Sequence, residues 1–266
     1  MHLLSVRLSF SFQKNRRMTV PTRITRFTDA NYEPIAQNRA PLKGFEDEPI
    51  LPLEDTLKRV SKYFNRIEEE VWVAKTNCEQ PEEGLTQNES ASIHLYTMQF
   101  KGGPSLFEIL NQTLRAENRD DLKPWFTYLK LFLTALCKLP SHTEIVWRGV
   151  RGVDLSSQYP RKKKFFWWVI SSCTTNLKIL ESDNFLGKTG KRTLFSIDCL
   201  NGKSVVLHSY FKDAEEEIIL MPGSYFEVMS LANPAEGLHI IHIKEIEPPF
   251  PTIARLISST TLSKGK

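Results

Sequence analysis

Apolar residues recur at three-and-four spacing through the first half of the chain, which is the spacing of one helix face. In the clearest case, large apolar residues follow Asp121 along one side until Leu139-Pro140 closes the run. Ser105, with Glu108 three residues later, predicts a capping box at the start of another helix. The pattern as a whole predicts helices over residues 52–71, 88–100, 105–114 and 121–139.

In the second half of the chain the period shortens to two, which is typical of strands. Turn residues such as Asn201-Gly202 and Pro222-Gly223 separate the alternating segments. Strands are predicted at residues 145–147, 165–170, 194–199, 204–207, 218–221, 225–229 and 238–243. Because the helices precede the strands, we expect an α+β fold with N-terminal helices packed on a two-sheet, mainly antiparallel β core.

The rest of the chain is expected to flank a single domain over residues 41–250. Residues 1–40 are predicted to be a poorly ordered tail, and residues 251–266 a C-terminal tail. The first residues lack the features of a secretory signal, and Met18 is an alternative start to Met1. No apolar run approaches the roughly 20 residues of a membrane helix. These observations favour a cytoplasmic protein with no membrane partner.

Composition narrows the class further. Of the 266 residues, 41% are hydrophobic and 25% are charged, which is ordinary for a folded globular protein. The net charge of +4 is too small to indicate nucleic acid as a partner. The four cysteines contain no C-x-x-C pair, so we expect no metal site.

Three polar features stand at the ends of predicted strands. Arg148-Gly149 follows the first strand, residues 171–175 read Ser-Ser-Cys-Thr-Thr after the aromatic strand, and Glu215-x-Glu217 precedes an apolar one. An arginine at a strand end can hold a phosphate, and hydroxyls there can orient a carboxylate. Each feature also has an ordinary interpretation, as a surface arginine, a cap for a helix near Asn176, and a solvated turn.

The two glutamates are the most informative of these features. On a strand Glu215 and Glu217 project together, whereas Glu216 points away and serves as an internal negative control. Two neighbouring carboxylates repel each other, and packing gives no reason to place them side by side. They are explained if a cationic substrate group or transition state lies between them.

Taken in order, the three features resemble the motifs of the ADP-ribosyltransferases of the Arg-Ser-Glu class. Residues 147–150 (Trp-Arg-Gly-Val) resemble the family's first motif, and residues 169–174 (Val-Ile-Ser-Ser-Cys-Thr) its aromatic-x-Ser-Thr-Ser motif. Residues 215–222 resemble the Glu-x-Glu segment that leads into an apolar strand and a proline. The resemblance covers roughly residues 41–248. It departs from the family at Cys173, which replaces a hydroxyl.

The resemblance implies NAD as co-substrate and a mono-ADP-ribosyl transfer. Glutamate at both ends of the Glu-x-Glu motif is similar to the arginine-specific subclass, so the expected partner is a protein acceptor with an exposed arginine. Arg148 would hold the NAD phosphates and ribose, and the Gly149 backbone would bind the nicotinamide carboxamide. Ser171 would hydrogen-bond Glu217.

The same resemblance assigns the chemical step to the glutamates. Glu217 would bind the nicotinamide-ribose 2′-OH and stabilise the cation that forms as nicotinamide leaves. Glu215 would orient the acceptor guanidinium and assist its deprotonation. Phe185 is a candidate to stack on nicotinamide. The alternatives are an NAD glycohydrolase, with water as acceptor, and a catalytically silent interaction domain.

Other polar motifs receive ordinary interpretations. Gly187-Lys188-Thr189 lacks the first glycine of a P-loop. His239 and His242 lie three apart on a predicted strand and therefore face opposite ways. Glu245-Ile246-Glu247, a second Glu-x-Glu, is expected to be a solvated strand end.

Overall fold

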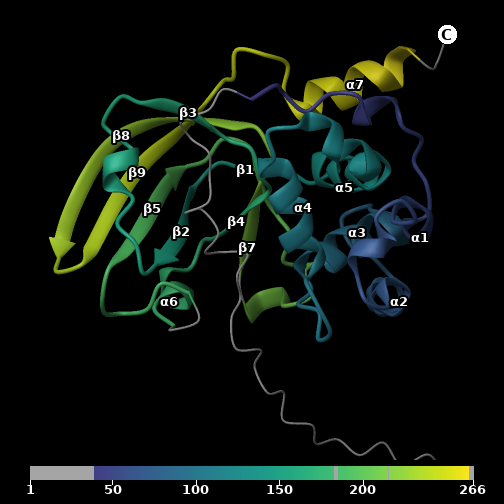
Figure 1. Cartoon of the computed structure of the whole chain (residues 1–266), viewed down its shortest axis with the longest axis horizontal. Helices are drawn as coiled ribbons and strands as arrows, with labels where there is room; N and C mark the ends of the chain where they lie inside the picture. Colours follow the sequence, from purple (N-terminus) through teal and green to yellow (C-terminus); the bar gives the residue numbers. More distant parts are fainter. Residues whose placement is uncertain (1–38, 183–184, 215, 264–266) are drawn as a thin grey trace, which may run out of the picture.

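The computed structural model describes residues 39–182, 185–214 and 216–263, which form a layer of helices beside a layer of strands (Figure 1). The helices are α1 (Leu53–Thr56), α2 (Ile67–Asn77), α3 (Gln87–Thr97), α4 (Leu106–Arg115), α5 (Phe126–Lys138), α6 (Leu177–Leu180) and α7 (Ile253–Ser263). The strands are β1 (Ser141–His142), β2 (Ile145–Arg151), β3 (Lys164–Trp167), β4 (Ser171–Thr174), β5 (Arg192–Asp198), β6 (Gly202–Ser204), β7 (Glu217–Leu220), β8 (Ser224–Ala235) and β9 (Leu238–Ile246). The predicted α+β class is confirmed. All but the last two residues of the predicted N-terminal tail lie outside the described ranges.

The helices follow the predicted periodicity, with one break, and the start of the helix predicted over residues 121–139 is the 3-10 helix η5 (Arg119–Trp125), which leads into α5. The capping box at the start of α4 is present, and the Ser105 amide donates to Glu108 Oε2 at 2.7 Å. The helix predicted over residues 52–71 is instead divided into α1, a 3-10 turn η4 (Ser61–Tyr63) and α2. The chain breaks before α2 because Arg66 has a left-handed conformation, with φ of 57°, that a helix cannot continue.

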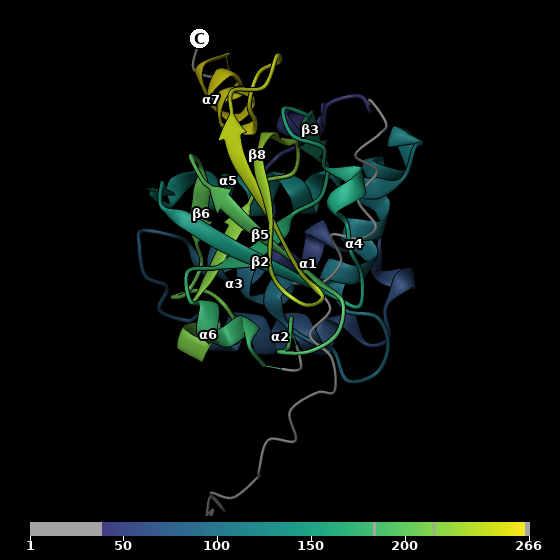
Figure 2. The same cartoon turned by 90° about the vertical axis from the view of Figure 1, so that its left-hand side faces the viewer.

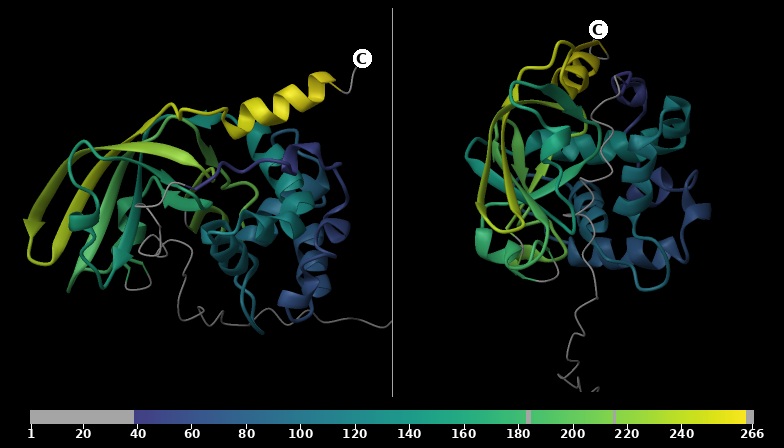
Figure 3. Two further views of the ribbon diagram at one scale, coloured as in Figure 1. Left: turned by 45° about the horizontal axis from the view of Figure 1, so that its top comes forward. Right: turned by 60° about the vertical axis from the view of Figure 1, so that its left-hand side comes forward.

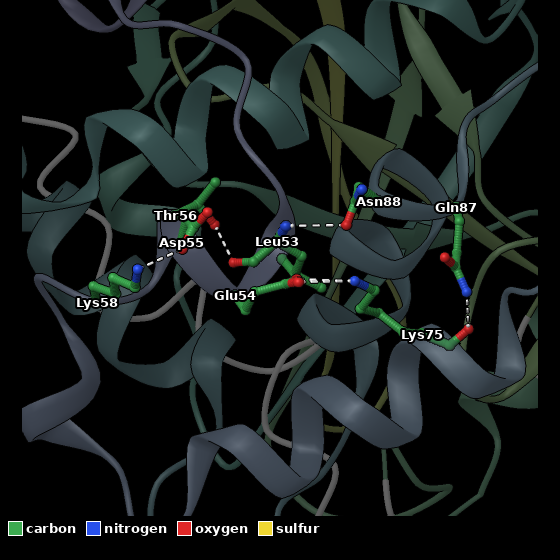
Figure 4. A network of polar contacts seen from close by, with 8 residues as sticks. All are labelled: Leu53, Glu54, Asp55, Thr56, Lys58, Lys75, Gln87 and Asn88. Carbon is green, nitrogen blue, oxygen red and sulfur yellow. Dashed lines mark hydrogen bonds and ion pairs between the residues drawn. The ribbon is translucent and has the colours of Figure 1, made fainter.

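A polar network joins the first three helices (Figure 4). The Leu53 amide in α1 donates to Asn88 Oδ1 of α3 at 3.1 Å, and Gln87 Nε2 donates to the Lys75 carbonyl of α2 at 3.0 Å. Lys75 Nζ in turn contacts Glu54 of α1 at 3.0 Å. The first turn of α3 is therefore fixed to both neighbouring helices.

The nine strands of the described residues form one hydrogen-bonded sheet in the order β1-β6-β7-β4-β2-β5-β9-β8-β3. All neighbouring pairs are antiparallel except β5 and β9, so the predicted antiparallel character is confirmed. The predicted division into two sheets takes a modified form. Four strands (β1, β6, β7, β4) and five strands (β2, β5, β9, β8, β3) meet only through the pair Trp147 and Thr174.

The apolar segment at residues 165–170 is predicted to be one strand. In the structure its two halves instead enter different hydrophobic cores. Phe165 and Trp167 belong to β3, which pairs with β8 at the far edge of the sheet. Val169 and Ile170 then cross towards the helices and lead into β4, which pairs with β7. Consequently the Ser-rich segment is a strand in its own right, rather than the end of the aromatic strand.

Strands β4 and β7 lie between two hydrophobic cores, next to the helices in the view of Figure 1. Ile219 of β7 packs into the core that the helices share. Ile218 and Leu220, its two neighbours, pack into the core enclosed by the strands, with Val146 and Phe195. A residue's position along β4 or β7 therefore decides which of the two environments its side chain enters.

Residues after 250, predicted as a C-terminal tail, include helix α7, which lies along the top of the helical layer in Figures 1 and 3. Ile253 and Ile257 of this helix pack into the helical core. Figure 2, viewed from the strand side, shows α7 at the top of the molecule, above β8. Every helix in the described part of the chain is too short or too polar to span a bilayer.

Candidate active site

Glu217 is the first residue of β7 and is completely buried. It pairs with Thr174 of β4, and its carbonyl accepts a hydrogen bond from the Val205 amide at 3.0 Å. The Ser209 hydroxyl donates to its carboxylate oxygen Oε2 at 3.4 Å. A buried carboxylate at a strand entrance thus lies beside a hydroxyl donor that the sequence pattern did not reveal.

The strand register decides which hydroxyls of β4 share a face with Glu217. Residues directly opposite each other on antiparallel strands project from the same face, and the face alternates along each strand. Thr174 lies opposite Glu217, and Ser172 lies opposite Ile219. Ser172 and Thr174 are therefore on the Glu217 face, and both are buried.

The predicted hydrogen bond from Ser171 to Glu217 is not formed. Ser171 lies opposite Leu220, three positions from the partner of Glu217 and on the other face of β4. Its buried Oγ has no hydrogen-bond partner among the described residues, and the same is true of Ser172 Oγ. The physical reason is that successive side chains of a strand lie on opposite faces, so Ser171 and Ser172 cannot both face Glu217.

Arg148 lies in the middle of β2, completely buried, rather than at a strand end as predicted. Its Nη1 donates to the Ser172 carbonyl at 2.8 Å, and its guanidinium lies 5.7 Å from the centre of the Trp167 ring. Cys173 lies beside it, and burial raises the pKa of the Cys173 thiol well above its usual value, although the positive charge of Arg148 acts in the opposite direction. Arg148 therefore lies in the core enclosed by the strands, together with Ser171 and Cys173.

Gly149 and Phe185 belong to a small apolar cluster over the other side of β2. Leu186 packs so closely that a methyl group on Gly149 would lie 2.9 Å from Leu186 Cβ, and for this reason only glycine fits there. Phe185 is buried in the same cluster, against which Trp147 also packs. The segment after α6 thus covers the part of β2 that carries the first motif.

The three glutamates of the Glu-x-Glu segment have different surroundings. Glu215, predicted to orient the acceptor, lies outside the described residues. The carboxylate of Glu216 accepts hydrogen bonds from Asn176 Nδ2 and Thr175 Oγ1, both at 2.9 Å. These two bonds lower the pKa of Glu216. Glu216 therefore fixes the start of α6 to the entrance of β7 and has a structural contact of its own.

The second Glu-x-Glu is not the solvated strand end that the sequence predicts. Glu245 is buried within β9, and its Oε2 accepts hydrogen bonds from the amides of Leu200 (2.7 Å) and Asn201 (2.9 Å). The carboxylate closes the turn between β5 and β6. No group of three or more His, Cys, Asp and Glu residues in the described ranges is arranged to hold a metal ion.

A cavity of about 130 Å³ lies beneath the start of α7, and Asn201 and Glu245 are among the residues that line it. Met221 and Pro222, which follow β7, line it together with Trp168 and Tyr225. Glu217 begins the same strand at its opposite end, and neither Arg148 nor Ser172 lines the cavity. The cavity therefore belongs to a different part of the molecule.

A family model described as NAD:arginine ADP-ribosyltransferase matches residues 47–248. No curated protein matches the chain in sequence at a significant level.

Several solved structures share the fold. HopU1, an ADP-ribosyltransferase of Pseudomonas syringae pv. tomato, has a TM-score of 0.55 at 19% identity, with 79% of this chain and 100% of that chain covered. Exoenzyme S from Pseudomonas aeruginosa, bound to carba-NAD and human 14-3-3 protein beta, has a TM-score of 0.53 at 18% identity, covering 78% and 96%. Vis, an ADP-ribosyltransferase from Vibrio splendidus in complex with agmatine, has a TM-score of 0.50 at 16% identity, covering 71% and 90%.

These structural likenesses, at low identity, show a shared fold, and the family model spans most of the chain. The chain therefore belongs to the NAD:arginine ADP-ribosyltransferase family, whose members use NAD as co-substrate.

Proposed function

We propose that this protein transfers ADP-ribose from NAD to arginine side chains of acceptor proteins and releases nicotinamide. The observation that carries the proposal is the buried carboxylate of Glu217, which lies on a face of β4 and β7 with the hydroxyls of Ser172 and Thr174. A carboxylate removed from water acts strongly on a positive charge that develops beside it.

In the proposed reaction the bond between nicotinamide and ribose C1′ breaks. The bonding electron pair leaves with the nicotinamide nitrogen, so positive charge develops on the ribose ring. The Glu217 carboxylate accepts a hydrogen bond from the ribose 2′-OH and stabilises this cation, as a carboxylate does in glycoside cleavage. A guanidinium nitrogen of the acceptor then forms the new bond to C1′ and loses one proton.

Arginine as the acceptor is the finer part of the proposal. A guanidinium is almost always protonated and needs a nearby carboxylate to become a nucleophile. We assign this role to Glu215 from the Glu-x-Glu pattern alone. Vis was solved with agmatine, a small guanidine compound, and the matching family model is described as arginine-directed, which supports the same choice.

The register supports Ser172, in place of Ser171, as the motif serine. Reading the motif one residue later, as Ile170-x-Ser172-x-Thr174, keeps a hydroxyl at both motif positions and places both on the Glu217 face. Cys173 then lies on the other face, so its departure from the family pattern leaves the hydroxyls beside Glu217 intact.

For Arg148 and Gly149 we propose modified roles. The Arg148 guanidinium holds β4 next to β2 through the Ser172 carbonyl, because it is completely buried; contact with an NAD phosphate would require it to become accessible. Gly149 remains the backbone position proposed for the nicotinamide carboxamide, with Phe185 beside it. Leu186 packs directly against this glycine.

The proposal is tested by measuring nicotinamide release and label transfer from NAD to agmatine and to a protein pool. Wild type is expected to do both, and Glu217→Gln to lose roughly 10³-fold or more in rate. Glu216→Gln is the matched control and should stay within a few-fold of wild type, because glutamine can still bond Thr175 and Asn176. Nicotinamide release without any transfer would indicate a glycohydrolase, and no turnover at all would contradict the proposal.

A further inference from the structure

The connection between β6 and β7 runs along helix α3, and three side chains of α3 hold two of its residues, His208 and Tyr210. Ser90 Oγ bonds His208 Nδ1 at 2.9 Å, and His94 Nδ1 donates to the His208 carbonyl at 3.0 Å. Thr97 Oγ1 accepts a hydrogen bond from the Tyr210 amide at 2.8 Å. Because these α3 residues are four and then three positions apart, they lie on one helix face.

Ser90, His94 and Thr97 thus form a clamp on the connection. Further contacts fix both sides of this clamp. His208 Nε2 bonds Glu83 Oε2 at 3.1 Å, and His94 Nε2 bonds Asn77 Nδ2 at 3.0 Å. The rings of His94 and Tyr210 meet edge to face, with centres 5.5 Å apart. Helix α3 itself is fixed at its first turn to α1 and α2 (Figure 4). The clamp therefore rests on a rigid element.

Ser209 lies between the two clamped residues, and its hydroxyl reaches the other way, to Glu217 Oε2 at 3.4 Å. The same hydroxyl accepts a hydrogen bond from the Phe211 amide at 3.3 Å, so its own position is fixed. Ser209 is completely buried, as is Glu217. A contact of 3.4 Å is long, as hydrogen bonds to reacting carboxylates often are before substrate is bound.

Ser90, His208 and Glu83 are arranged as a nucleophile, a base and an orienting carboxylate would be. However, Ser90 and His208 are each only 1% exposed, so a substrate carbonyl has no access to the serine. The neutral imidazole donates from Nε2 to Glu83 and accepts from Ser90 at Nδ1, which fixes its tautomer. The arrangement thus orients the connection rather than providing a second reactive centre.

We propose that Ser209 is a positioning residue for Glu217, and that the α3 face formed by Ser90, His94 and Thr97 keeps it in place. This inference rests on the proposed role of Glu217. A hydroxyl donor to one carboxylate oxygen holds the group in the orientation that the ribose cation requires. Removing it is expected to slow the chemical step, with little effect on NAD binding.

The test compares two pairs of variants. Ser209→Ala should lower kcat about tenfold with the KM for NAD within twofold, and Ser209→Thr, which keeps the hydroxyl, should recover most of the rate. Ser90→Ala should lower kcat about threefold by loosening the clamp. Ser92→Ala is its matched control: Ser92 is also buried on α3, but among the described residues its hydroxyl bonds only the Glu89 carbonyl, so kcat should not change.

A second readout separates this inference from the proposed function. The side-chain carboxyl ¹³C signal of Glu217, assigned by its loss in Glu217→Gln, should shift in Ser209→Ala and stay in place in Ser92→Ala. If wild type fails to cleave NAD, the proposed function is wrong, and this signal still decides the Ser209 contact. An unchanged Glu217 signal, an unchanged kcat in an active protein, or equal losses in Ser90→Ala and Ser92→Ala would overturn the inference. Thermal unfolding of each variant identifies any loss that comes from misfolding.

Discussion

The two faces of β4 differ in what they can do, although their residues alternate along only four positions. Ser171 and Cys173 face the core enclosed by the strands, where the buried guanidinium of Arg148 lies. Ser172 and Thr174 face the side on which Glu217 lies. The first face holds the sheet together around a buried charge, whereas the second presents hydroxyls beside a buried carboxylate. Chemically similar neighbours therefore receive different roles from the pleat of the strand.

The largest expected effect comes from Arg148→Met, which changes the core enclosed by the strands. Methionine fills part of the space of the arginine side chain. It leaves the Ser172 carbonyl without its charged donor, and it removes a positive charge from the core enclosed by the strands. The free energy of unfolding should fall by about 2–4 kcal/mol, measured by urea denaturation. Arg151→Met, on the exposed end of the same strand, is the control and should cost at most about 1 kcal/mol. Equal losses would mean that the burial of Arg148 has no special importance.

A second, smaller effect sharpens the comparison between the faces. Thr174→Val removes a hydroxyl on the Glu217 face. It should lower kcat several-fold, which is the loss in rate expected when one hydrogen bond is removed. Cys173→Ser changes only the face of β4 that lies towards the core enclosed by the strands, so kcat should stay within about twofold of wild type. The serine would restore the residue usual for the family at this place, so a large gain in rate would show that the motif is read from Ser171 after all.

The smallest effect concerns the dependence of stability on pH. Burial lowers the pKa of both His94 and His208 below the usual histidine value, although contacts with the His208 carbonyl and with Glu83 act in the opposite direction. As pH falls below about 6.5, the unfolded chain takes up protons before the folded chain does. Stability from these residues is thus present above that pH and is lost below it, by at most about 1.4 kcal/mol per pH unit for each histidine.

This expectation is checked by urea unfolding between pH 7.5 and 5.5. His94→Gln should make the decline shallower, because one of the two titrating groups is gone. A decline of the same steepness in the variant would assign the effect to other groups.

Most of the helical half and the type of fold could be predicted because their signals are local. The periodic stripe before Leu139 gave α5, and Ser105 with Glu108 gave the start of α4. Residues 165–170 misled because they are apolar throughout: Phe165 and Trp167 enter one core, and Val169 and Ile170 the other. A continuous apolar run contains no sign of where one strand ends and the next begins.

The sequence motifs singled out the Ser-rich segment and Glu217, which the pairing of β4 with β7 brings together, but they could not show which hydroxyls share a face with Glu217. A run of hydroxyl residues contains no alternation that distinguishes Ser171 from Ser172; only the pairing with β7 does. Glu245 was misread because its amide donors lie more than forty positions earlier in the chain. Ser209 gave no signal in the pattern, because its contact with Glu217 depends on a connection held by a distant helix.

The most direct test of the central claim is the rate of nicotinamide release by Ser172→Ala and Ser171→Ala under saturating NAD. The two substitutions remove the same hydroxyl from adjacent, equally buried positions, neither of which has a side-chain partner among the described residues. We predict a loss of roughly tenfold to a hundredfold in kcat for Ser172→Ala and less than threefold for Ser171→Ala. The reverse result, or equal losses, would contradict the claim that Ser172 and Thr174, rather than Ser171, act together with Glu217.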